Sequence, residues 1–246
     1  MKSNFLKMFS LAITLSLLSA CAATQVALSK RKLDVQTKMS ASLFIDPVEK
    51  ESSKKVFLQI KNSSDKPDFK VTQELENAFR SKGFKITSKM DQANFAIQIN
   101  ILQVGKMDPN AAEAAVYKGY GMEGVAIGAG AAYVAGGSDK AIVGAGILGG
   151  IAAVVADSLV KDVNFSVITD VQIKEKAGGK VKVQNTAMHY NQSGTSGGVV
   201  STYSEKSNWK IYQTRVLSSA NKVNLEFNEA APELQKALAN SIASIF

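Results

Sequence analysis

The stretch FAIQINI, residues 95–101, decides the fold. Large apolar side chains occupy every second position, and small or polar side chains lie between them. This period of two is typical of a strand that buries one face. The same alternation returns in FSVITDVQI, residues 165–173. The two stretches predict a sheet whose parts come from both sides of a long intervening segment.

Residues 33–110 predict a compact α+β unit around the first of these strands. VFLQI, residues 56–60, is a short apolar strand. A helix is expected from Phe69 to Lys82, with Gly83 at its C-terminal cap, and Phe84–Ile86 begins another strand. This order predicts a small sheet with a helix on one face. The carboxylates of this unit are scattered and form no catalytic pair.

Residues 162–227 return to a strand pattern after the intervening segment. Further strands are expected at Val181–Val183 and Trp209–Leu217. Between them Asn191–Asn208 is rich in Ser and Gly, which predicts a long exposed loop, either a mobile connection or a contact for a partner. A last helix is expected from Asn228 as its N-cap, with Pro232 in the first turn and an apolar stripe that covers the sheet.

The intervening segment, residues 119–160, holds most of the chain's 18 glycines. Two apolar stretches, Gly121–Ala135 and Ala141–Val160, flank a polar turn, and each is close to the lower length limit of a membrane span. Small residues recur at every fourth position, which permits close contact between helices in lipid. We therefore predict a transmembrane helical hairpin; the alternative is a Gly-rich hairpin buried in a soluble core. The glycines expected at helix contacts are Gly124, Gly128, Gly146 and Gly150.

Two parts of this segment also fit a nucleotide-binding pattern. GYGMEG (119–124) and GAGILG (144–149) both have the form G-x-G-x-x-G, and the second is the better candidate. A dinucleotide site needs a preceding strand and an acidic residue about 20 positions further on, which would be Asp170. The three apolar residues before the motif are too few for that strand. We predict that the chain binds no nucleotide cofactor.

The first 20 residues combine two lysines, an apolar run and small residues, which is typical of a signal peptide. LSAC, residues 18–21, resembles a bacterial lipobox, which implies that Cys21 is acylated and becomes the mature N-terminus. Ala22 in place of Asp implies sorting to the outer membrane. More than one acyl chain gives a stable anchor. The basic residues 30–32 that follow either form a solvated patch or contact anionic headgroups.

The composition restricts the class of protein. The chain has 246 residues, a formal net charge of +8 and 46% hydrophobic residues, as expected of a folded protein with a real core. A single Cys excludes an intramolecular disulfide and a Cys-based zinc site. A single His argues against a His-rich metal site and a Ser-His-Asp triad. We expect no catalytic residues, no metal and no nucleic-acid partner.

The predicted fold class is therefore α+β: a small β-sheet domain with two covering helices, interrupted by a Gly-rich membrane helical hairpin. The expected parts are a signal peptide (1–20), a lipidated N-terminus and tether (21–32), the first part of the α+β domain (33–118), the hairpin (119–160) and the second part of the domain (161–246).

The whole chain resembles the TraT family, the outer-membrane lipoproteins of conjugative plasmids. The resemblance weakens at residues 107–118 and 174–210, where differences in partner contact are expected. The stretches that carry it are KRKLDVQTKMS (30–40), VFLQIKNSSDK (56–66), DVNFSVITDVQI (162–173), YQTRVLSSANKVNL (212–225) and residues 241–246.

The resemblance implies a homo-oligomer anchored in the outer membrane, without catalytic residues. It implies surface exclusion, which blocks redundant mating between donor cells, and a role in complement resistance. The implied partners are outer-membrane lipid, further copies of the chain, and mating-pair or surface components of another cell. The alternative function is an envelope scaffold or pore component, although the apolar stretches lack the repeated polar stripe that lines a wide aqueous pore.

Overall fold

The computed structural model describes residues 30–48, 53–117, 120, 161–190 and 198–246, with the backbone alone for residues 180–206. The signal peptide and Cys21 lie outside the described residues. The predicted helical hairpin does so as well, with Gly124, Gly128, Gly146 and Gly150. None of the helices that the structure describes has the length and apolar character needed to cross a membrane.

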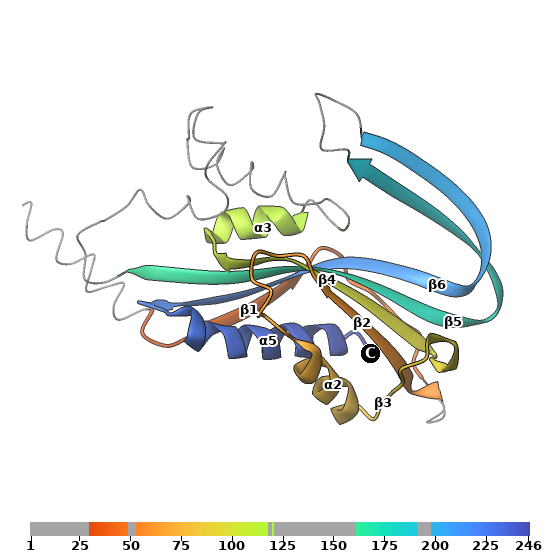
Figure 1. The fold of residues 1–246 in the computed structure, drawn as a ribbon, viewed down its shortest axis with the longest axis horizontal. Helices are drawn as coiled ribbons and strands as arrows, with labels where there is room; N and C mark the ends of the chain where they lie inside the picture. The colour runs from red at the N-terminus through yellow and green to blue at the C-terminus, as the bar shows by residue number, and fades with distance from the viewer. Residues whose placement is uncertain (1–29, 49–52, 118–119, 121–160, 191–197) are drawn as a thin grey trace, which may run out of the picture.

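The described residues build a curled six-stranded sheet in the order β1-β6-β5-β4-β2-β3 (Figure 1). Strand β2 is parallel to β3 and β4, and the other neighbouring pairs are antiparallel. The strands are β1 (Asp34–Met39), β2 (Lys55–Asn62), β3 (Lys85–Ile86), β4 (Phe95–Lys106), β5 (Asp162–Tyr190) and β6 (Gly198–Val223).

The pairing of β4 with β5 confirms that one sheet joins the two sides of the Gly-rich segment. Phe95 lies opposite Glu175, and Ile101 lies opposite Thr169. Strand β1 was not anticipated from the sequence. It pairs with β6, so the sheet begins immediately after the basic residues 30–32.

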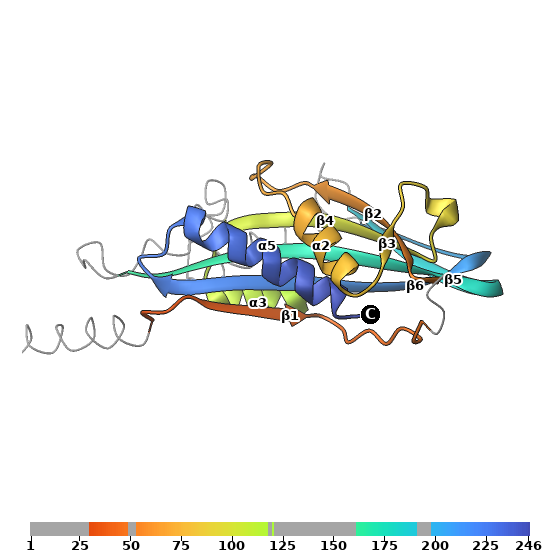
Figure 2. The ribbon, with the colours of Figure 1, turned by 90° about the horizontal axis from the view of Figure 1, so that it is seen from below.

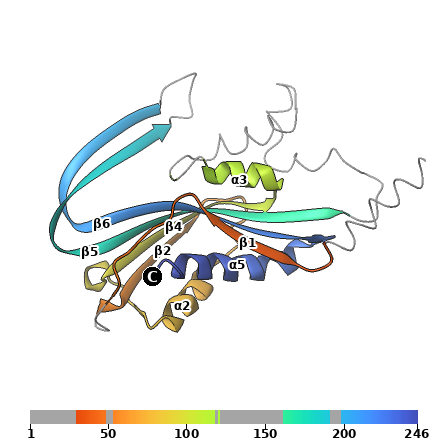
Figure 3. The same cartoon turned by 180° about the vertical axis from the view of Figure 1, so that it is seen from behind.

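Helices α2 (Thr72–Ser81) and α5 (Phe227–Ala243) cover one face of the sheet, as predicted (Figure 2). A third helix, α3 (Pro109–Tyr117), lies on the opposite face and was not predicted (Figure 3). Its sequence is mostly alanine on the buried side, so it lacks the large apolar residues that mark an amphipathic helix. A short 3₁₀ turn, Met90–Gln92, precedes β4.

The main core lies between the sheet and helices α2 and α5. Both helices bury large side chains against the sheet. These are Leu75 and Phe79 of α2, and Leu234 and Leu238 of α5, all fully buried. The C-terminal Phe246 closes one end of this core. Its ring packs edge-on against the rings of three other phenylalanines, with centroids 5.1–5.6 Å apart; these are Phe79, Phe84 and Phe95.

The ends of the two predicted helices differ slightly from expectation. Helix α2 begins at Thr72, and Phe69 is instead a buried residue ahead of it. Gly83 follows α2 with a φ of +84°, which confirms the predicted C-terminal cap. Helix α5 begins at Phe227, so Asn228 lies inside it, and Glu226 stands at the N-cap without a side-chain capping bond.

The predicted loop Asn191–Asn208 is wrong for most of its length. Strand β6 already begins at Gly198, where it pairs with Tyr190 of β5. We call residues 181–190 with 198–207 the β5–β6 arm. It extends beyond the helices and curls toward the α3 side (Figure 1). Pairing with a partner strand overrides the weak strand preference of a Ser-rich segment.

Candidate functional site

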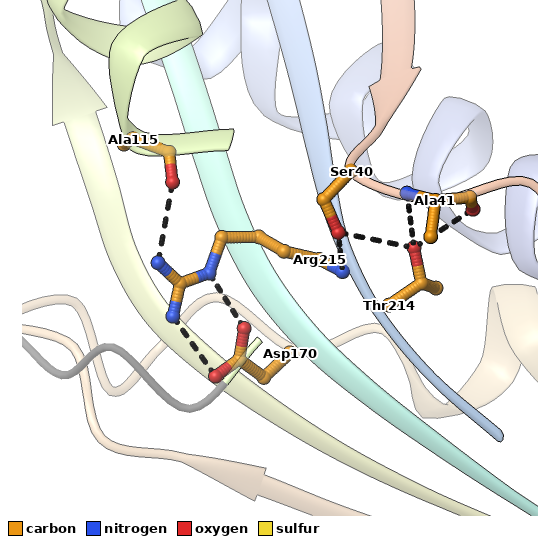
Figure 4. A network of polar contacts seen from close by, with 6 residues as sticks. All are labelled: Ser40, Ala41, Ala115, Asp170, Thr214 and Arg215. Atoms are coloured by element: carbon orange, nitrogen blue, oxygen red, sulfur yellow. Dashed lines mark hydrogen bonds and ion pairs between the residues drawn. The ribbon is translucent and has the colours of Figure 1, made fainter. Parts of the chain in front are cut away.

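A buried ion pair connects the sheet to α3. Arg215 of β6 is fully buried, and its Nε and Nη2 donate to the two carboxylate oxygens of Asp170 on β5, at 2.6 and 3.0 Å (Figure 4). The third nitrogen, Nη1, donates to the carbonyl oxygen of Ala115 at 3.2 Å. A planar guanidinium suits this forked contact with a carboxylate. One side chain therefore holds β5, β6 and α3 together.

The backbone beside this ion pair fixes the segment that leaves β1. The amide of Arg215 donates to Ser40 Oγ at 2.9 Å (Figure 4). The amide of Ser40 donates in turn to the carbonyl of Arg215, also at 2.9 Å. The hydroxyl of Thr214 donates to the carbonyl of Ala41 at 3.2 Å. The Arg215 position is thus tied to β1 on one side and to α3 on the other.

The ion pair also bears on the alternative prediction of a dinucleotide site at Asp170. That site required Asp170 at the carboxyl end of a parallel strand, free to bind a ribose. Asp170 instead lies within β5, which is antiparallel to both of its neighbours, and its carboxylate accepts two bonds from Arg215. The topology therefore contradicts the dinucleotide alternative.

The two chain segments expected to lead to the membrane meet at one end of the sheet. The amide of Val223 donates to the carbonyl of Lys30 at 2.9 Å, and the amide of Asn224 donates to the carbonyl of Lys161 at 2.8 Å. The side chain of Asn224 accepts a further bond from the Lys161 amide. Lys30 follows the predicted lipid tether and Lys161 follows the predicted membrane hairpin, so both leave the described body beside the same turn.

Four glutamines form a row across the α3 face, at mutually paired positions of four neighbouring strands. We call it the glutamine row; its members are Gln59 (β2), Gln98 (β4), Gln172 (β5) and Gln213 (β6). Each amide donates to the next in the same direction. The Nε2–Oε1 distances are 2.8 Å from Gln213 to Gln172, 2.8 Å from Gln172 to Gln98 and 2.5 Å from Gln98 to Gln59.

A cavity of about 400 Å³ lies against one half of this row. Its walls include Gln59, Gln98, Asn100, Lys61 and Tyr120, with Asp170 at the side of the ion pair. Burial raises the pKa of the Tyr120 hydroxyl above its ordinary value of 10.0, and the charge of Asp170 adds to this effect. Tyr120 therefore remains a protonated hydrogen-bond donor at neutral pH.

The predicted lipidation residue and the four predicted helix-packing glycines all lie outside the described part of the chain. Neither the Arg215–Asp170 pair nor the glutamine row was predicted from the sequence. The glutamines do stand at the outward positions of predicted strands, but only the register shows that they lie side by side. Among the described residues, no three His, Cys, Asp or Glu side chains are grouped to hold a metal ion.

Comparison with known proteins identifies the family. Residues 32–246 match the family described as enterobacterial TraT complement resistance protein. A TraT complement resistance protein of Escherichia coli is 40% identical over 247 residues, covering 100% of both chains. The TraT complement resistance protein of Escherichia coli strain K12 is 40% identical over 261 residues. The chain belongs to the TraT family.

A more distant TraT complement resistance protein, from Wigglesworthia glossinidia brevipalpis, is 25% identical over 246 residues and covers 99% of this chain. The TraT family is one of non-enzymatic surface proteins, and this chain is accordingly not an enzyme. The Arg215–Asp170 pair and the glutamine row are therefore interpreted as contacts between structural elements or as a surface for a partner. Helix α3 and the β5–β6 arm lie within residues 107–118 and 174–210, the two stretches where differences in partner contact are expected.

Proposed function

We propose that this TraT family member is a lipid-anchored outer-membrane protein that mediates surface exclusion, with complement resistance as a second role. It acts by binding or masking at the cell surface as a homo-oligomer. The observation that carries the proposal is the family match across residues 32–246, with 40% identity over the full length of the relatives. Cys21 is the acylated residue in this proposal.

The meeting of Lys30 and Lys161 supports attachment to the membrane at one end of the body. Both segments are bound to the Val223–Asn224 turn, although 131 positions separate them in the chain (161 − 30). A lipid tether and a membrane hairpin that leave from one turn can enter the same bilayer without distorting the sheet. The β5–β6 arm extends from the other end of the strands (Figure 3).

The β5–β6 arm supports self-association. In the described part of the chain no third strand pairs with its two strands beyond the body. An isolated two-stranded ribbon is marginal in water, and its unpaired edges invite pairing with another chain. Further copies of the chain would supply that pairing in a closed ring.

A mating assay tests surface exclusion directly. Recipient cells that produce the full chain should receive a conjugative plasmid encoding a related TraT protein less often than recipients without it. Cys21→Ser should restore transfer, because the thiol is required for lipid attachment. Unchanged transfer into recipients whose outer membrane contains the protein would contradict the proposal.

The oligomer is tested at the glycines expected between membrane helices. Gly128→Leu or Gly146→Leu should convert a detergent-resistant oligomer into smaller species, because overpacking costs roughly 1–3 kcal/mol at each close contact. Val125→Leu is the control and should assemble normally. Native mass spectrometry of all three variants gives the stoichiometries. Normal assembly of both glycine variants would exclude the small-residue interface.

A further inference from the structure

The glutamine row has hydrogen-bonding capacity to spare. A glutamine amide offers two N–H donors and an oxygen with two lone pairs. Within the row, Gln98 and Gln172 each use one donor and one acceptor on their neighbours. The bonds between neighbours fix the orientation of every amide. The row therefore presents an ordered line of donors and acceptors.

The charge of this surface restricts what it can bind. Asp170, the acidic residue in the cavity wall, is compensated by the two bonds from Arg215. Lys61 is the cation among the described residues of the cavity wall, and it is exposed. The remaining polar groups are neutral amides and the protonated hydroxyl of Tyr120. This combination suits a neutral polyhydroxyl ligand, and the described residues around the cavity provide no cluster of cations for a nucleic acid or a phosphate-rich surface.

The spacing of the row distinguishes between neutral ligands. Neighbouring strands lie about 4.8 Å apart, so the paired glutamines recur at about that interval across the sheet. In an extended peptide, the side chains and backbone groups on one side recur about every 6.6 Å. After one repeat they would no longer lie opposite successive glutamines of the row. Successive units of a straight β-1,4-linked glycan recur at an interval close to that between strands. Neighbouring units are turned over relative to each other, but each carries hydroxyl groups on both edges, so every unit still offers donors and acceptors to the row.

We propose that the glutamine row binds a β-1,4-linked glycan strand that runs across β2, β4, β5 and β6. Each sugar unit accepts from and donates to one glutamine amide. At the β2–β4 side one unit enters the cavity, where Tyr120 and Asn100 contact its hydroxyl or acetamido groups. Four glutamines correspond to a tetrasaccharide.

Calorimetry with three tetrasaccharides tests the proposal. The full-length protein is held in a zwitterionic detergent, because glycoside detergents carry competing sugars. Chitotetraose and cellotetraose have β-1,4 linkages with and without acetamido groups, whereas maltotetraose has α-1,4 linkages and does not run straight. We expect saturable binding of at least one β-1,4 tetrasaccharide at millimolar concentration and none of maltotetraose. Which of the two binds distinguishes an acetylated from an unsubstituted glycan.

Substitutions locate the binding. Gln98→Leu and Gln172→Leu preserve side-chain size and remove the amide, and each should weaken binding about tenfold. Gln59→Leu, at an exposed position on β2, is a second variant that leaves the fold unaffected. Gln36→Leu is the matched control, because Gln36 is an exposed strand glutamine on β1, outside the row. Its affinity should equal that of the parent.

The proposal is overturned by the absence of saturable binding of either β-1,4 tetrasaccharide, by equal binding of maltotetraose, or by unchanged affinity in the row variants. Preferential binding of an extended tetrapeptide would assign the row to a peptide partner and also reject it. Surface exclusion is measured separately by mating, so failure here leaves the proposed function intact.

Discussion

The two faces of the sheet are built from alternate residues of the same strands, yet they serve different ends. The face under α2 and α5 buries large aliphatic and aromatic side chains such as Ile97, Val171 and Val216. The face under α3 has alanines, the Arg215–Asp170 pair and the glutamine row. Apolar burial is non-directional and supplies most of the stability. Polar contacts instead fix which groups meet, and they are costly when one partner is missing.

The largest expected effect is on the α3 face. Arg215→Ala would leave Asp170 buried without its cation, which costs about 3–5 kcal/mol. It should also release α3, since the bond to the Ala115 carbonyl is lost. Denaturant unfolding in detergent, followed by the fluorescence of the single tryptophan, Trp209, measures the change.

A double substitution sharpens this comparison. Arg215→Leu combined with Asp170→Leu removes both charges and should recover much of the loss, because paired apolar residues can replace a buried ion pair. A double variant as unstable as Arg215→Ala would show that the Ala115 and β1 contacts, and not charge burial, dominate at this position.

The opposite face should respond by a different mechanism. Leu238 of α5 is fully buried in the main core, and Leu238→Ala should lower the free energy of unfolding by about 3 kcal/mol through lost burial and a residual cavity. Leu238→Met conserves volume and should cost less than half as much. The same denaturant titration reports both, and equal losses would mean that packing shape, not buried volume, controls this site.

The contrast between the two faces explains which parts of the fold could be predicted from the sequence. The α2–α5 face could be predicted from periodicity. The alternation in FAIQINI and the apolar stripe of α5 show which side chains are buried, whichever element packs against them. The α3 face depends on register. Gln98 lies beside Gln172 only because β4 pairs with β5 in one alignment, and no local pattern contains that information.

The same reasoning accounts for the elements that were missed. Helix α3 is held by alanines against Ile168 and Leu217 and by the Arg215 bond, none of which gives a strong local pattern. Strand β1 is short and mostly exposed, and it exists because β6 is available to pair with it. Residues 198–208 became strand for a similar reason, because β5 continues opposite them.

A smaller loss of stability is expected at Gly83, where the backbone conformation, and not packing on either face of the sheet, restricts the residue. Gly83 ends α2 at a φ of +84°, and Gly83→Ala should cost about 1 kcal/mol. A Cβ there would meet only Lys54, at 3.6 Å or more, so the cost is conformational and not steric. Gly178→Ala on β5 is the control, because a Cβ there meets nothing within 4 Å. Thermal unfolding should distinguish the two, and an equal shift would exclude the left-handed requirement at Gly83.

The smallest effect concerns the exposed contact between α3 and the edge strand. Lys38 of β1 and Glu113 of α3 lie 2.8 Å apart between Nζ and Oε1. The hydrogen bond from Lys38, followed by that from Tyr117, lowers the pKa of Glu113 below its ordinary value of 4.5. The hydrogen bond to Glu113 raises the pKa of Lys38 above its ordinary value of 10.5. Each charged form is therefore favoured by folding.

The sign of the pH dependence follows from these two shifts. The Glu113 contribution is present above pH 4.5 and is lost as the pH falls through its lower folded-state pKa. The Lys38 contribution is present below pH 10.5 and is lost as the pH rises through its higher folded-state pKa. Glu113→Gln should thus destabilise the protein slightly at neutral pH and make no difference in strong acid. Because both groups are solvent-exposed, solvent and salt screen the contact, so its effect should stay below that of Gly83→Ala. Unfolding curves of parent and variant at acidic and neutral pH give the difference, and a gap that widened in acid would show that another carboxylate controls the docking of α3.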